Sequence, residues 1–212
     1  KPRFVLGSVG PGTRQTTLGQ ISFDDLYGGY QEQMGGLLEG GADGILIETC
    51  QDLLQIKAAV AAAQAAIGAR QDKLIYVSVT VETTGTLLVG SSIWAVMAAL
   101  EPYPLDVLGL NCATGPEAMK RHLEAIAKLW RGGIGCMPNA GLPTLKDGQV
   151  HYPLGPAAYT QAFAPLVKEL GLSIAGGCCG TTPEHIRELR KALGAAPAPA
   201  PRSVQPPEQV AS

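Results

Sequence analysis

Residues 173–184 have the sequence Ser-Ile-Ala-Gly-Gly-Cys-Cys-Gly-Thr-Thr-Pro-Glu. The segment opens with a short apolar run that is typical of a buried strand, and a glycine-rich turn follows it. The two threonines and Pro183 then mark a helix start, because a hydroxyl residue is favoured at the N-cap and proline at the first helical position. The segment therefore predicts a strand, a turn and a helix, with Cys178 and Cys179 side by side where the strand ends.

The same unit recurs along the chain. Further apolar runs are continuous rather than alternating, as in parallel strands that are buried on both faces. The predicted strands are 4–9, 44–47, 74–80, 107–110, 133–137 and 173–175, and the predicted helices are 23–39, 52–67, 92–100, 116–131, 156–170 and 183–193. Six such units fit an α/β fold that is either an open doubly wound sheet or most of a (βα)₈ TIM barrel.

Composition narrows the class of protein. The 212 residues are 46% apolar and 16% charged, which is typical of a compact globular domain, and we expect it to span residues 1–194. Residues 195–212 are rich in proline and alanine at first and then polar, so they are predicted to be a linker or tail.

Charge and sequence pattern also argue against several partners. A net charge of −2 gives no basic footprint for nucleic acid, and no apolar run is long enough for a membrane span. No signal peptide pattern is present at the start of the chain. Five cysteines, an odd number, favour a reducing compartment, so a cytoplasmic location is predicted.

A third cysteine, Cys112, lies in the segment Leu-Asn-Cys-Ala-Thr-Gly-Pro at 110–116, where another apolar run meets a helix that begins with proline. Two βα units separate it from Cys178 and Cys179, so all three thiols are expected at the same edge of a parallel sheet. Three thiolates fill three of the four tetrahedral positions of Zn²⁺ and leave one open. The pattern thus predicts a zinc site of the catalytic type.

Other interpretations of these cysteines are open. The adjacent pair could form a strained vicinal disulfide, or all three could be small buried apolar residues. A zinc site with a fourth protein ligand would be a non-catalytic, stabilising module. A metal-free barrel could instead bind phosphate at Gly176 and Gly177. The two remaining cysteines, Cys50 at the start of a helix and Cys136 within a strand, are expected to be structural.

Other polar residues follow predicted strands. Glu48 and Thr49 come after the run 44–47, and Glu48 is expected to bind a substrate ammonium group, although stabilisation of a helix N-terminus is the alternative. Asp52 is expected to cap the following helix. Thr49, Asn111 and Asn139 are expected to contact substrate at the same edge.

The remaining motifs predict no further site. His122 and His185 are expected on outer helix faces and His151 in a polar loop, so none needs a catalytic role. The glycines at 7–12 lack the spacing of a dinucleotide-binding turn, and no Walker A sequence occurs.

Two of these motifs together resemble a known family. Gly-Leu-Asn-Cys at 109–112 and Gly-Gly-Cys-Cys-Gly at 176–180 are similar to the homocysteine S-methyltransferase domain, over about residues 3–193. Gly-Pro at 10–11, Ile-Glu-Thr at 47–49 and Pro-Asn-Ala-Gly-Leu-Pro at 138–143 resemble its cobalamin-dependent branch more than its betaine-dependent branch.

This resemblance implies a (βα)₈ barrel that makes methionine. Cys112, Cys178 and Cys179 would bind Zn²⁺, homocysteine sulfur would take the fourth position, and Glu48 would hold the ammonium group. The methyl group would come from methylcobalamin on another domain, recharged from methyltetrahydrofolate on a second barrel, with residues 195–201 as the connection. Betaine or S-methylmethionine is the alternative donor.

One departure from the family affects the expected fold. The first strand of the family normally carries an Asp-Gly-x-x-Gly segment and the second ends in a Glu-Thr type sequence, and neither precedes Lys1. We therefore expect this chain to lack the first two βα units of the barrel, with an acidic residue near the substrate, and not to close a barrel alone unless a separate piece supplies them.

Overall fold

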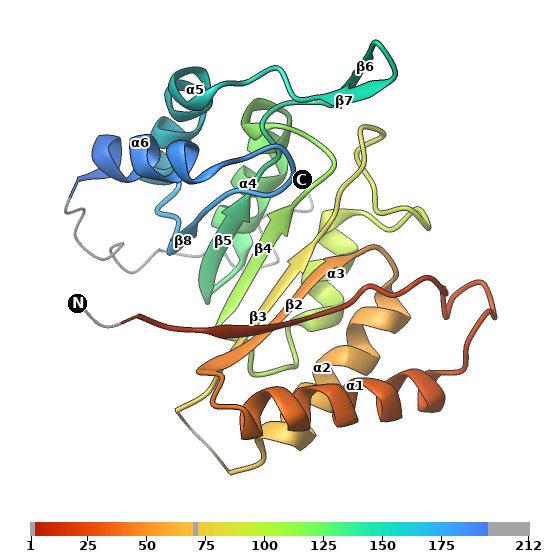
Figure 1. Cartoon of the computed structure of the whole chain (residues 1–212). Helices are drawn as coiled ribbons and strands as arrows, with labels where there is room; N and C mark the ends of the chain where they lie inside the picture. Colours follow the sequence, from red (N-terminus) through yellow and green to blue (C-terminus); the bar gives the residue numbers. More distant parts are fainter. Residues whose placement is uncertain (1–2, 70–71, 195–212) are drawn as a thin grey trace.

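The computed structural model describes residues 3–69 and 72–194, and the predicted linker or tail at 195–212 lies outside them (Figure 1). Its main sheet has six parallel strands that follow one another in chain order. They are β1 (Leu6–Val9), β2 (Gly44–Cys50), β3 (Leu74–Val79), β4 (Val107–Asn111), β5 (Gly133–Met137) and β8 (Ile174–Ala175). A doubly wound sheet reverses its strand order at a switch point, whereas this order is that of a barrel wall. The doubly wound alternative is therefore wrong.

Six helices of the described residues cover the outside of the sheet; five of them connect strands and the sixth follows the last strand (Figure 1). They are α1 (Phe23–Glu39), α2 (Leu53–Ile67), α3 (Ile93–Leu100), α4 (Pro116–Leu129), α5 (Pro156–Glu169) and α6 (Pro183–Leu193). Asp52 is the N-cap of α2 as predicted, and its carboxylate accepts from Leu54 N at 2.9 Å. Each helix contacts the next one along the chain, so the helices form one continuous layer. No helix in the described part of the chain is both long and apolar enough to cross a membrane.

The two faces of the sheet are filled differently. The outward-facing strand residues pack against the helices, and Ile45, Val77 and Leu108 are fully buried there. On the opposite face the ring of Tyr76 lies across two neighbouring strands, where Gly109 and Gly135 provide the space. A Cβ at Gly109 would lie 2.8 Å from the Tyr76 hydroxyl oxygen. Glycine at these two strand positions therefore admits a large side chain next to the edge of the sheet where the strands end. We call this edge, which carries the cysteines, the rim.

Two local predictions were wrong about secondary structure. Cys50 ends β2 instead of opening a helix, because β2 continues beyond the predicted run through an irregularity in its pairing with β3. His151 belongs to an unpredicted antiparallel hairpin, made of β6 (Thr144–Lys146) and β7 (Gln149–His151). Its turn has positive φ at both Asp147 and Gly148, as a type I′ hairpin turn requires.

The predictions that His122 and His185 lie on outer helix faces were also wrong, since both are 5% exposed. His122 lies on the inward face of α4, where its Nε2 accepts from Arg121 Nε at 3.0 Å. His185 accepts from the backbone N–H of Thr182 through Nδ1 at 3.1 Å. Its Nε2 therefore carries the proton and donates to Leu154 O at 2.8 Å. His185 thus fixes the start of α6, directly after the cysteine turn.

Candidate metal centre

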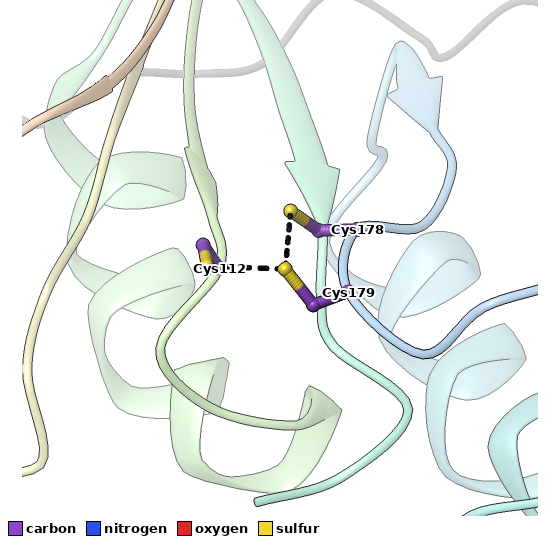
Figure 2. Close-up of side chains that lie close together, drawn as sticks. All are labelled: Cys112, Cys178 and Cys179. Atoms are coloured by element: carbon purple, nitrogen blue, oxygen red, sulfur yellow. Dashed lines mark hydrogen bonds between the residues drawn. The ribbon is translucent and has the colours of Figure 1, made fainter. Parts of the chain in front are cut away.

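The structure brings together the three cysteines that the sequence singled out (Figure 2). The Sγ atom of Cys179 lies 3.8 Å from that of Cys112 and 3.8 Å from that of Cys178. All three sulfur atoms lie within 4.8 Å of one another. All three thiols are free, so the vicinal disulfide alternative does not describe this structure.

The spacing of the sulfur atoms fits a tetrahedral zinc ion. A Zn–S bond of about 2.3 Å and a tetrahedral angle place neighbouring sulfur ligands roughly 3.8 Å apart. Two of the three sulfur pairs already have this separation. In the described part of the chain, the cluster contains only these three ligands of the Cys, His, Asp or Glu type. The donor set therefore fits zinc with one coordination position left for another ligand.

Burial separates the site cysteines from the two others. Cys112 and Cys178 are partly exposed and Cys179 is exposed, whereas Cys50 and Cys136 are fully buried. Burial raises the pKa of Cys50 to about 12 and also raises the pKa of Cys136. Cys50 and Cys136 thus behave as small core residues, as predicted, and the site cysteines do not.

A tight turn allows the adjacent cysteines to face the same point. Thr181 N donates to Cys178 O at 3.2 Å, which closes a four-residue turn from 178 to 181. Gly180 has φ +76° at its third position, where a turn of this kind needs a residue with positive φ. The glycines that flank the pair were expected to permit this bend, and of these Gly180 is the one that adopts positive φ.

The loop after β5 holds this turn in place. Cys178 N donates to Pro138 O at 2.8 Å, and Ala140 N donates to Cys179 O at 2.9 Å. The carboxamide oxygen of Asn139 accepts from Cys179 N at 3.1 Å. The segment 138–140 therefore fixes the backbone of both cysteines from the neighbouring strand end.

Cys112 reaches the site through left-handed backbone. It has φ +64° and Ala113 has φ +59°, in a region that residues other than glycine rarely adopt. Cys112 N donates to Met137 O at 3.2 Å, and Thr114 N donates to Cys112 O at 2.7 Å. Backbone strain of this kind costs about 1–3 kcal/mol per residue and clusters at functional sites.

Hydrogen bonds among the thiols change their acidity. The interaction with the Cys178 thiol lowers the pKa of Cys112 from 9.0 to about 5, although burial opposes the change. The same interaction raises the pKa of Cys178, which therefore keeps its proton. One thiolate thus exists at neutral pH without a metal, which favours the binding of a cation.

The other residues predicted for the site lie at the neighbouring strand ends. Thr49 Oγ1 accepts from Asn111 Nδ2 at 2.8 Å, and that nitrogen also lies 3.9 Å from Cys178 Sγ. Glu48 precedes Thr49, and its carboxylate accepts a hydrogen bond from Ser8 Oγ on β1. These contacts place Asn111 between Thr49 and Cys178, while contact of Glu48, Thr49, Asn111 and Asn139 with substrate stays a prediction.

Sequence reasoning missed three residues that support the site. Ser78 Oγ donates to Asn111 Oδ1 at 2.7 Å, and Thr181 Oγ1 donates to Cys178 O at 2.7 Å. Tyr159 OH donates to Gly176 O at 2.7 Å from α5. Ser78 carried one detectable signal, since it is a polar residue within an otherwise apolar buried run.

Comparison with known proteins places the chain in a family. The model of the homocysteine S-methyltransferase family matches residues 1–193. The chain belongs to this family. It is 51% identical over 192 residues to methionine synthase of Mycobacterium leprae and 50% identical over 194 residues to that of Mycobacterium tuberculosis. These matches cover 90% and 91% of the chain but 16% of the length of each relative.

A solved structure supports the same fold. The apo form of the homocysteine methyltransferase MmuM from Escherichia coli has a TM-score of 0.68 and 25% sequence identity to this chain. The match covers 89% of the chain and 62% of MmuM. The α/β architecture with a parallel sheet of six strands is therefore that of a homocysteine methyltransferase.

Proposed function

We propose that the chain is the homocysteine-binding part of a methionine synthase, in which a zinc site activates homocysteine for methylation. The observation that carries the proposal is the cluster of three free thiols at two strand ends, with sulfur separations of 3.8 Å. Family membership and the two related methionine synthases support the substrate and the reaction class.

Cys112, Cys178 and Cys179 would hold Zn²⁺, and a thiol bound to zinc is deprotonated at neutral pH and so becomes a nucleophile. With homocysteine sulfur held by zinc, the chain would not need to supply a general base for the thiol proton. The residues of the chain instead position the ligands and the substrate. The turn at Gly180 and the loop at 138–140 keep the two adjacent thiols directed at one point.

Glu48 would bind the ammonium group of homocysteine. Ser8 donates to one oxygen of this carboxylate, which orients it and leaves its other oxygen for a substrate N–H. Thr49 next to it is bonded to Asn111, whose amide also contacts Cys178. The proposed ammonium site at Glu48 is therefore the chain neighbour of a residue that is hydrogen-bonded to the proposed sulfur site, which suits a short amino acid that carries both groups.

The methyl donor would be methylcobalamin on another domain, recharged from methyltetrahydrofolate. The chain spans 16% of the length of the methionine synthases that it matches, which leaves room in those proteins for such domains. The segment 138–143, which resembles the cobalamin-dependent branch, supports the cysteine turn through Asn139 and Ala140. Betaine or S-methylmethionine is the alternative donor, and a competition assay with intact protein would separate them.

We further infer that the six strands are part of an eight-stranded barrel and that two more βα units complete it. The sequential strand order and the 62% coverage of MmuM support this inference. Residues 195–212 would act as a linker to further domains of a cytoplasmic protein.

Two other functions find less support. A non-catalytic zinc module needs a fourth protein ligand, and the described residues offer three of the Cys, His, Asp or Glu type. A phosphate site at Gly176 and Gly177 needs free backbone N–H groups, but those of Gly176 and Cys178 donate to Cys136 O and Pro138 O.

The test is metal analysis and a homocysteine titration on the full chain, on Cys178→Ser and on Cys50→Ala as a control outside the site. We expect one zinc per chain in the wild type and the control, and a change in metal coordination when homocysteine is added. Cys178→Ser should lose most of its zinc. The proposal fails if the wild type takes up no stoichiometric zinc, or if homocysteine leaves the coordination unchanged.

A further inference from the structure

Asn111 is the last residue of β4, and its side chain is fully buried behind the cysteine cluster. Its carboxamide oxygen accepts from Ser78 Oγ at 2.7 Å and from Thr49 N at 3.0 Å. Its nitrogen donates to Thr49 Oγ1 at 2.8 Å and lies 3.9 Å from Cys178 Sγ. One amide thus joins the ends of β2, β3 and β4 to a cysteine of the turn after β8.

The surroundings fix which end of this amide faces the sulfur. A backbone N–H can only donate, so the atom that faces Thr49 N has to be the carboxamide oxygen. The hydroxyl of Ser78 adds a second donor to the same oxygen. A flipped amide would set its NH₂ group against the Thr49 N–H, which removes one hydrogen bond and leaves a buried donor unsatisfied. The NH₂ group is therefore directed at Thr49 Oγ1 and Cys178.

We propose that Asn111 is a positioning residue that donates an N–H···S hydrogen bond to Cys178 and thereby sets the direction and the donor strength of this metal ligand. The inference rests on the proposed function, since it assumes that Cys178 binds a metal. A thiolate that accepts a hydrogen bond gives less electron density to the metal. Residues that hydrogen-bond a metal ligand typically change metal affinity by about 10- to 100-fold when they are replaced.

Asn111 differs from Ser78 and Thr80, its hydrogen-bond partners, because its side chain faces the sulfur of Cys178. Ser78 bonds only the amide oxygen, so its loss would loosen Asn111 without removing the donor that faces the sulfur. Thr80 Oγ1 donates to the backbone oxygen of Asn111 at 3.0 Å and supports the strand end instead of the side chain. Ser78→Ala is therefore a matched control for Asn111→Ala.

The direct test is NMR spectroscopy of the wild-type full chain loaded with ¹¹³Cd²⁺. A scalar coupling between ¹¹³Cd and the side-chain amide protons of Asn111 is expected, because the coupling passes through the sulfur only where an N–H···S bond exists. If backbone couplings from the cysteine segments are seen and the Asn111 coupling is absent, the inference is overturned. This measurement requires no variant, so it decides the question even if Asn111→Ala does not fold.

The variants supply the second test, with Co²⁺ as the spectroscopic probe. In Asn111→Ala the sulfur-to-cobalt charge-transfer band should move to lower energy, because the thiolate regains electron density. Zinc affinity in a chelator competition should fall about 10- to 100-fold, because Cys178 is no longer held in position. Ser78→Ala should keep the wild-type band. Equal bands and equal affinities in Asn111→Ala and the wild type refute the inference while the proposed function stands. A wild-type chain that takes up neither metal refutes the proposed function, and the inference with it.

Discussion

Replacing Gly180 by alanine tests how the turn after β8 holds the cysteine pair. Gly180 has φ +76°, and a residue with a Cβ in this left-handed region loses about 1–2 kcal/mol. The added Cβ would also overlap the ring of Tyr152 and lie 2.6 Å from Tyr152 Cβ. Because the near part of the Tyr152 side chain is involved, a rotation of the ring alone cannot relieve the contact. Such overpacking costs about 1–3 kcal/mol, so Gly180→Ala should lose roughly 2–5 kcal/mol in free energy of unfolding.

Gly41→Ala is the matched control, because Gly41 has φ +94° but no atom within 4 Å of an added Cβ. It should lose about 1–2 kcal/mol, the backbone strain alone. Urea unfolding of the metal-free proteins measures both values, and zinc competition should show weaker binding in Gly180→Ala only. Adding Tyr152→Ala to Gly180→Ala should restore part of the loss. The reasoning is refuted if Gly180→Ala is no less stable than Gly41→Ala, or if both variants bind zinc equally well.

The remaining predictions concern thiol reactivity and substrate binding. Iodoacetamide should modify three cysteines per chain in the native metal-free protein, because Cys50 and Cys136 are fully buried. Mass spectrometry should count no modified cysteine with zinc bound and five in denaturant. Modification of Cys50 or Cys136 in the native state would contradict their burial. In the metal-free protein Cys112 should stay reactive as the pH falls to about 6 and lose reactivity only below about 5, because its pKa is lowered to about 5 and its thiolate persists above that pH. Glu48→Gln should raise the dissociation constant of homocysteine by roughly 10- to 100-fold in a cobalt-monitored titration, because a charged hydrogen bond is lost. Ser8→Ala should raise it by less, because the charge of Glu48 stays. Equal dissociation constants for Glu48→Gln and the wild type would show that Glu48 does not bind the substrate.

The sequence predicted the elements well because each βα unit carries its own local signals. Continuous apolar runs, proline at the first helical position and hydroxyl or carboxylate caps gave bounds that differ from the structure by at most three residues. The same signals placed Cys112 and the pair Cys178 and Cys179 at strand ends, and parallel strands bring such ends to one edge. Spatial proximity of the three thiols thus followed from local patterns and one topological rule.

The missed features depend on contacts between segments far apart in the chain. His185 is buried because it contacts the carbonyl of Leu154, which lies 31 residues earlier in the chain. The position of His185 within its helix could not predict this contact. Asn111 was expected to contact substrate because it lies at the edge formed by the strand ends, yet its side-chain partners Ser78 and Thr49 come from two other strands. The hairpin at 144–151 was different, since the Asp147-Gly148 pair is a local turn signal that was overlooked.

The strained residues of the rim connect the metal site to folding. Thr49, Cys112 and Ala113 have positive φ without being glycine, and each such conformation costs about 1–3 kcal/mol. The side chain of Asn111 bonds both backbone and side chain of Thr49, so the same amide that faces Cys178 stabilises one strained residue. A metal that binds the folded rim and not the unfolded chain adds its binding free energy to these contacts. The strands next to the rim are held by buried apolar packing. Loss of the metal should therefore loosen the strand ends before it affects the rest of the sheet. The local stability of the rim should depend on zinc occupancy more than the global stability of the chain does.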